Sequence, residues 1–107
     1  RILYKHGKSV ATKRLVLVYS KRKFGGIRSG FSVSKKIGNS VQRNRLRRQM
    51  KEAMRVCLQE IPDIHYAVVF IARNGIQQAD YWEILNNMKQ LLCRAGILPA
   101  GESTKNK

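Results

Sequence analysis

Acidic residues are scarce in this 107-residue chain, which has 6 Asp and Glu against 22 Lys and Arg and a formal net charge of +16. Proline and cysteine occur only twice each, and aromatic residues make up 7%. No apolar run approaches the about 20 residues needed to cross a bilayer, and no signal peptide is visible. Two widely spaced cysteines are too few for a zinc site. The length and the 43% of hydrophobic residues instead favour one small globular domain.

The excess positive charge lies in the first half of the chain. Residues 1–55 contain seventeen basic residues and one acid, Glu52, whereas residues 56–107 contain five of each sign and are neutral. A field of this strength repels itself and calls for a polyanionic partner. We favour nucleic acid over an anionic membrane surface, because the apolar side of the basic helix described below has a domain to pack against.

The two cysteines, Cys57 and Cys93, each lie within an apolar helical pattern. This placement predicts buried free thiols rather than a disulfide or a metal site, which is typical of a reducing compartment. We therefore expect a cytoplasmic protein.

Hydrophobic periodicity predicts an α+β fold with the element order α-β-β-α-β-α. The expected elements are a helix end at 1–6, strands at 14–20 and 27–34, a helix at 40–60, a strand at 66–72 and a helix at 79–95. They predict one domain over residues 1–98, a small central sheet with helices packed on it. Residues 99–107 lack periodicity and are expected to be a disordered tail.

The helix expected at 40–60 has a sharply divided surface. Its predicted core side consists of Leu46, Met50, Ala53, Met54 and Cys57. An exposed stripe is predicted from Asn44, Arg48, Lys51 and Arg55, with Arg45 on the far side of it. Arg43 and Arg47 fall on or beside the core side, so we expect them to project into a cleft between helix and sheet.

A phosphate-binding corner is predicted where this helix begins. Asn39 and Ser40 are suited to cap the helix, whose N-terminal N–H groups attract anions. Lys35, Lys36 and Gly38 lead directly into it. The alternative, a merely solvated basic face, is typical of helices with alternating Glu and Lys, but Glu52 alone interrupts this run.

A second candidate surface for nucleic acid, indicated less strongly by the sequence, is the polar side of the strand at 27–34. It carries Arg28, Gly30, Ser32 and Ser34. Aromatic side chains near it in sequence are suited to stack on bases, although each is more often a core residue. These aromatic residues are Tyr4, Tyr19 and Phe24.

No self-sufficient catalytic or metal site is evident. His6 and His65 are isolated and are expected at the surface or in capping roles. The acids Asp63, Asp80 and Glu83 are scattered through the neutral half, which disfavours a paired-carboxylate metal site. We therefore assign no catalytic and no metal-binding residue.

Residues 32–52 (SVSKKIGNSVQRNRLRRQMKE) closely resemble the protein subunit of bacterial ribonuclease P. That family is marked by a Lys-Lys-x-Gly-Asn-x-Val-x-Arg-Asn-Arg-x-Lys/Arg-Arg run that opens a long helix. The matching positions are Lys35, Lys36, Gly38, Asn39, Val41, Arg43, Asn44, Arg45, Arg47 and Arg48. The resemblance covers residues 1–96. The chain departs from the family in two respects: it has only the end of the family's first helix, and it has Val18 where some members carry an aromatic residue.

The resemblance implies a ribosomal-protein-like fold with a left-handed βαβ crossover. It also implies that the chain is the non-catalytic partner of a catalytic RNA, which removes the 5′ leader of precursor tRNA by endonucleolytic hydrolysis with Mg²⁺ held mainly by RNA. No membrane and no further protein partner is expected. The alternative is a structural RNA-binding module of ribosomal-protein type with no role in cleavage; a protein-only nuclease would need acidic metal ligands that the basic half lacks.

Two sets of site residues follow from the motif and the resemblance together. The predicted RNA-binding residues are Lys35, Lys36, Asn39, Arg43, Asn44, Arg45, Arg47, Arg48, Lys51 and Arg55. The predicted cleft for the single-stranded leader, between helix and sheet, is assigned Tyr4, Val18, Arg28, Phe31 and Ser32.

Overall fold

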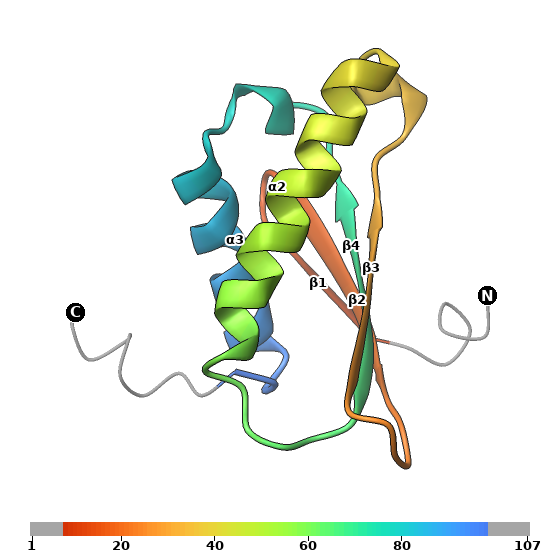
Figure 1. Cartoon of the computed structure of the whole chain (residues 1–107), viewed down its shortest axis with the longest axis vertical. Helices are drawn as coiled ribbons and strands as arrows, with labels where there is room; N and C mark the ends of the chain where they lie inside the picture. The colour runs from red at the N-terminus through yellow and green to blue at the C-terminus, as the bar shows by residue number, and fades with distance from the viewer. Residues whose placement is uncertain (1–7, 99–107) are drawn as a thin grey trace.

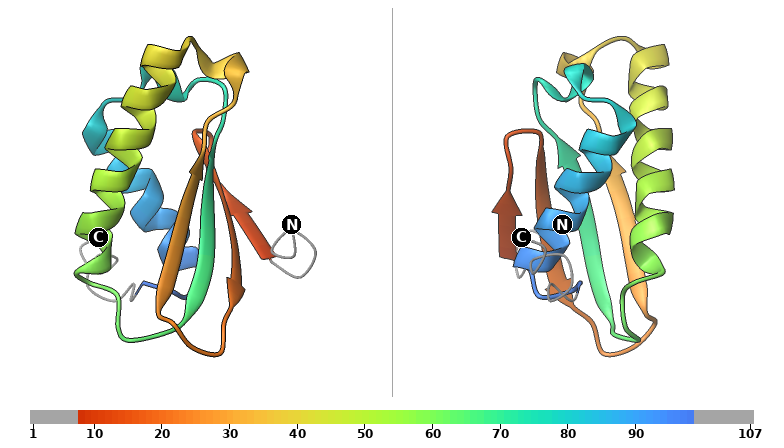
Figure 2. Two further views of the ribbon diagram at one scale, coloured as in Figure 1. Left: turned by 45° about the vertical axis from the view of Figure 1, so that its right-hand side comes forward. Right: turned by 90° about the vertical axis from the view of Figure 1, so that its left-hand side faces the viewer.

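A four-stranded mixed sheet carries two α-helices on one of its faces (Figures 1 and 2). The computed structural model describes residues 8–98. The strands are β1 (Lys8–Ala11), β2 (Leu15–Lys21), β3 (Ile27–Ser32) and β4 (Tyr66–Ala72). The helices are α2 (Ser40–Leu58) and α3 (Tyr81–Arg94), each preceded by a short 3-10 turn, η1 (Lys35–Ile37) and η2 (Ile76–Gln78).

The strand order is β1-β2-β4-β3, with β3 at one edge. The β1–β2 and β2–β4 pairs are antiparallel, whereas β3 and β4 are parallel. Leu17, Phe70 and Phe31 lie in one cross-strand row, and the first two are fully buried beneath the helices. Since side chains alternate along a strand, Arg28, Gly30 and Ser32 belong to the opposite, open face.

The connection from β3 through α2 to β4 is a left-handed crossover. In the right-hand view of Figure 2 the helices face the viewer, both strands run upward, and β4 lies to the left of β3. Nearly all βαβ connections move to the right in this orientation. The handedness that the family resemblance implied is therefore present.

Helix α2 starts at a complete capping box. The Asn39 side chain accepts a hydrogen bond from the Gln42 backbone N–H at 2.9 Å, and the Gln42 side chain accepts one from the Asn39 N–H at 3.0 Å. Gly38 leaves room for this box, because a Cβ there would lie 2.2 Å from Gln42 Oε1. The core side predicted for the helix is confirmed in full.

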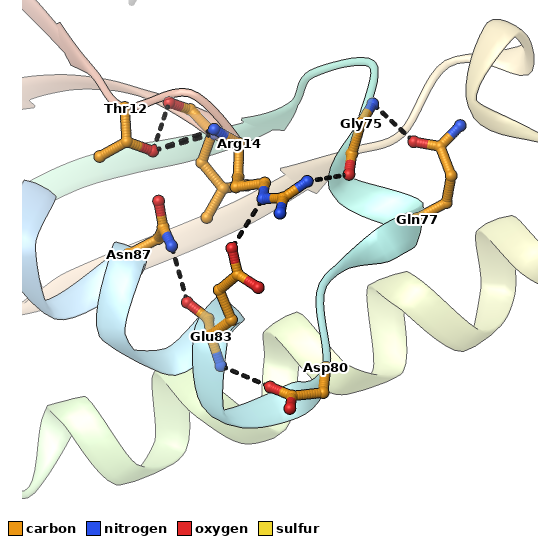
Figure 3. Close-up of polar contacts among 8 residues, drawn as sticks. Thr12, Arg14, Gly75, Gln77, Asp80, Glu83 and Asn87 are labelled. Atoms are coloured by element: carbon orange, nitrogen blue, oxygen red, sulfur yellow. Dashed lines mark hydrogen bonds and ion pairs between the residues drawn. The ribbon is translucent and has the colours of Figure 1, made fainter.

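Helix α3 is fixed to the sheet through Arg14, the residue just before β2 (Figure 3). Arg14 Nε lies 2.8 Å from Glu83 Oε2, and the same guanidinium donates to the Gly75 carbonyl. Asp80 caps the helix by accepting from the Glu83 N–H at 2.9 Å. One partly buried arginine therefore joins β2, the turn before η2 and the first turn of α3.

The α+β fold and its main elements are confirmed, with boundaries shifted by a few residues. Strand β1 was missed because its four residues, KSVA, are mostly exposed and show no alternation of apolar and polar side chains. The helix end expected at 1–6 and the tail expected at 99–107 lie outside the described residues.

Cys57 is fully buried in the main core cluster, as predicted, and burial raises the pKa of its thiol to about 11. The thiol is therefore protonated at neutral pH and acts as a small apolar side chain. Cys93 is only half buried. No helix in residues 8–98 is long and apolar enough to cross a membrane.

The Arg14 contacts predict a stability difference between neighbouring substitutions. Arg14→Met removes the ion pair with Glu83 and one of the two hydrogen bonds to the Gly75 carbonyl, which also accepts from the Gln78 N–H, so we expect the free energy of unfolding to fall by roughly 1–2 kcal/mol. Lys13→Met, at the exposed adjacent position, should change it by less than about 0.5 kcal/mol. Urea denaturation measures both values, and equal losses would contradict the anchoring role.

Candidate nucleic-acid interface

The surface of α2 carries a row of cations at successive turns: Arg43, Arg47, Lys51 and Arg55. These residues are spaced four apart and therefore lie above one another along the helix. Arg43 and Arg47 are half buried, while Lys51 and Arg55 are exposed. We refer to these four residues as the cationic row.

Two further arginines and an asparagine flank the cationic row. Arg45, Arg48 and Asn44 are exposed, as predicted. Arg47 Nη1 donates to Asn44 Oδ1 at 3.0 Å, which orients this guanidinium along the helix surface. The α2 surface is poorly neutralised, since within residues 8–98 the only ion pair on α2 joins Arg55 and Glu52 at 3.8 Å, with both side chains more than half exposed.

The corner at the start of α2 is built differently from the prediction. Lys35 and Lys36 are exposed on η1, which the buried Ile37 fixes to the core. Arg43 Nε donates to the Gly38 carbonyl at 3.1 Å. Arg43 therefore turns back toward the loop that precedes the helix, and the expectation that it enters a helix–sheet cleft together with Arg47 was wrong. The half-buried guanidinium takes an acceptor at the helix start instead.

A groove of about 660 Å³ lies between α2 and the edge strand β3. Arg47, Lys51 and Arg55 contribute to one side of its lining, and Phe31, Met54 and Leu58 provide apolar surface. The Phe31 ring lies nearly parallel to Phe70, with ring centroids 6.2 Å apart. We call this cavity the α2–β3 groove.

The residues assigned to the leader cleft do not share one surface. Arg28 and Ser32 are exposed on the open face of the sheet, where Val18 also lies but is 8% exposed. Phe31 faces the helices instead, because it alternates with Ser32 along the strand. Tyr4 is outside the described residues. The predicted single cleft is therefore corrected to two surfaces, the open face and the α2–β3 groove.

The other two aromatic residues suggested for base stacking, Tyr19 and Phe24, have different surroundings. Tyr19 is half buried and packs near Tyr66, with centroids 6.3 Å apart, whereas Phe24 is 73% exposed in the β2–β3 turn. His65 Nδ1 accepts from the Gly26 N–H of that turn at 2.8 Å, a capping role as expected. His6 lies outside the described residues.

Met54 and Leu58 were not predicted from the sequence as groove residues. Their i,i+4 spacing, alongside the cationic row, was the pattern that could have identified them.

The described residues do not suit a protein-bound metal ion. No group of three or more His, Cys, Asp or Glu side chains in residues 8–98 is arranged to hold one. The acids of α3 and its cap are engaged elsewhere, Asp80 with a helix N–H and Glu83 with Arg14.

Comparison with known proteins gives consistent matches. Residues 1–96 match the family model described as Ribonuclease P. The Ribonuclease P protein component of Clostridioides difficile is 44% identical over 97 residues, covering 91% of this chain and 85% of that protein. Its counterpart from Thermoanaerobacter sp. is 39% identical over 100 residues, covering 94% and 85%.

Solved structures agree with these sequence matches. The RNase P protein of Staphylococcus aureus superposes with a TM-score of 0.81 at 32% identity, covering 90% of this chain and 87% of that one. The RNase P protein from Thermotoga maritima gives a TM-score of 0.80 at 28% identity, with 87% of each chain covered.

The geometry of α2 predicts which cations matter most for RNA affinity. Arg43→Ala and Arg47→Ala should each weaken binding of a structured RNA roughly three- to tenfold, since both guanidinium groups are oriented by hydrogen bonds. Lys21→Ala, at the exposed end of β2, should weaken it less than about twofold. Filter binding at fixed salt measures all three, and comparable losses would contradict the proposed arrangement.

Proposed function

The chain belongs to the family of ribonuclease P protein components, and we propose that it acts there by binding both the catalytic RNA and the 5′ leader of precursor tRNA. Binding both promotes endonucleolytic removal of the leader, giving the mature 5′ end, while the chemistry is performed by the RNA. The observation that carries this proposal is the poorly neutralised basic surface of α2. We further propose that the protein works in the cytoplasm and needs no other protein partner.

The catalytic RNA is assigned to the outward surface of α2 and the corner before it. The assigned residues are Lys35, Lys36, Asn39, Arg43, Asn44, Arg45, Arg47, Arg48, Lys51 and Arg55. Asn39 contributes by capping the helix, since its side-chain oxygen is already bonded within the capping box. Cations spread over several helical turns suit a folded RNA, whose backbone is recognised by charge and shape.

The single-stranded leader is assigned to the open face of the sheet. Gly30 and Ser32 are small, so a nucleotide strand is able to approach β3 closely, and Arg28 offers an exposed guanidinium on the same face. Val18 forms part of the surface beneath. Tyr4 stays an expectation for this surface, and Phe31 is withdrawn from it because it faces the helices.

Magnesium is assigned to the RNA. The described residues provide no cluster of metal-binding side chains, and the basic half of the chain has a single acid. The protein's own contribution is to reduce the repulsion between the phosphates of the catalytic RNA and those of precursor tRNA. Without the protein, more bound metal cations are needed to reduce that repulsion.

A cleavage assay tests this function. Catalytic RNA and labelled precursor tRNA are combined at low Mg²⁺ with and without the protein, and we expect the protein to increase the cleavage rate. The protein should also increase the affinity for precursor over mature tRNA, and Arg28→Ala should reduce that preference while leaving affinity for mature tRNA unchanged.

Two results would overturn the proposal. No enhancement of cleavage, together with equal affinities for precursor and mature tRNA, would indicate a structural RNA-binding module. Cleavage by rigorously RNA-free protein would place the chemistry in the protein instead.

A further inference from the structure

We infer that the α2–β3 groove is a binding site for one unstacked nucleotide of a single-stranded RNA segment, with the base in the groove and its phosphate on the cations beside it. The inference rests on the proposed function, in that the partner is RNA. It assigns a site distinct from the open sheet face, on the β3 side of Arg47, Lys51 and Arg55, three of the cations that the proposed function gives to the catalytic RNA. Its basis is the combination of apolar lining residues, cations without strong acidic partners and an accessible strand edge.

Apolar side chains line the groove from both sides, Phe31 on β3 and Met54 and Leu58 on α2. Phe31 is half buried and stacked on Phe70, which fixes its orientation, and Met54 is 2% exposed. Leu58 is 39% exposed although it is a large apolar residue. Apolar lining combined with a few polar groups is typical of small-ligand sites. The volume of about 660 Å³ lies within the roughly 300–1,000 Å³ of small-ligand sites.

The positive charge of the groove lining favours an anionic ligand. Arg47, Lys51 and Arg55 all contribute to the groove, and Glu52, 3.8 Å from Arg55, is their only acidic contact among the described residues. An apolar peptide or a second copy of this chain would have to desolvate these cations without neutralising them, and two copies would also repel through their charge of +16 each. A nucleotide satisfies both the apolar lining and the cations, because its base is flat and largely apolar on its faces and its phosphate is anionic.

The neighbouring strand leaves the groove accessible. Among the described residues β3 is an edge strand that pairs with β4 alone, and Ser29 and Gly30 present little side-chain bulk to the groove. The groove is therefore open along the strand edge, so that a chain of nucleotides is able to enter and leave on either side of the bound base. Recognition by stacking and charge predicts tolerance of base identity.

The three methionines allow a direct test on the intact protein. With methyl-¹³C methionine, Met54 reports on the groove, while the fully buried Met50 and Met88 serve as internal controls. A short oligouridylate should shift the Met54 methyl signal, and an abasic oligomer of equal length and charge should not. The oligouridylate should also bind at least about fivefold more tightly than the abasic oligomer.

Blocking variants complete the test. Ser29→Phe fills the groove from the strand and should abolish the Met54 shift, whereas Gln90→Phe, which adds the same ring at an exposed position on α3, should preserve it. Unchanged Met50 and Met88 signals establish that each variant is folded. If Ser29→Phe perturbs them, Leu58→Gln, which removes apolar surface at a partly exposed site, should weaken the shift instead.

Two results would overturn the inference: a Met54 signal that is unmoved at saturating oligouridylate, or one that moves equally with the abasic oligomer. Either result combined with enhanced cleavage of precursor tRNA would reject the nucleotide site alone. Loss of that enhancement as well would reject the proposed function.

Discussion

The structure depends on the burial of one side of α2 against the sheet and α3. Leu46, Met50 and Met54 each contribute roughly 1.5–3 kcal/mol when removed from water. The like-charged neighbours in the cationic row each cost only about 0.2–0.5 kcal/mol. Burial therefore outweighs repulsion, and a helix that would be unfavourable alone is stable on this domain. The same packing that stabilises the helix fixes its charges on the outer surface, where they raise the local potential that attracts phosphates.

The left-handed crossover determines what lies beside those charges. Because α2 returns across the sheet next to the edge strand β3, the cationic row meets strand backbone rather than another helix, and the α2–β3 groove results. Helix α3 covers the rest of that face, fixed by Arg14 and Glu83. The opposite face carries neither helix (Figure 2). One topological choice therefore gives the domain two candidate RNA surfaces with different chemistry, a cationic helix and an open sheet face.

Much of this arrangement was predictable from sequence. The 3.6-residue period identified every buried residue of α2, and the Asn39 cap and strand β4 were placed correctly, because local propensity and burial agree there. Strand β1 was missed, since an exposed four-residue edge strand forms only through pairing with β2. Arg43 was misplaced because a helical wheel gives the direction of a side chain at Cβ, whereas its Gly38 acceptor depends on the loop. Phe31 was grouped with Arg28 and Ser32 although strand alternation separates them.

The central claim is that the poorly neutralised cations of α2 bind RNA phosphates. It is tested most directly by measuring the affinity of the protein for catalytic RNA across a range of salt concentrations. With about six phosphate contacts, log Kd should rise with log salt with a slope of roughly 4–5, and removing one cation of the row should lower the slope by a little under one. A slope near zero, or one unchanged by those substitutions, would contradict the account.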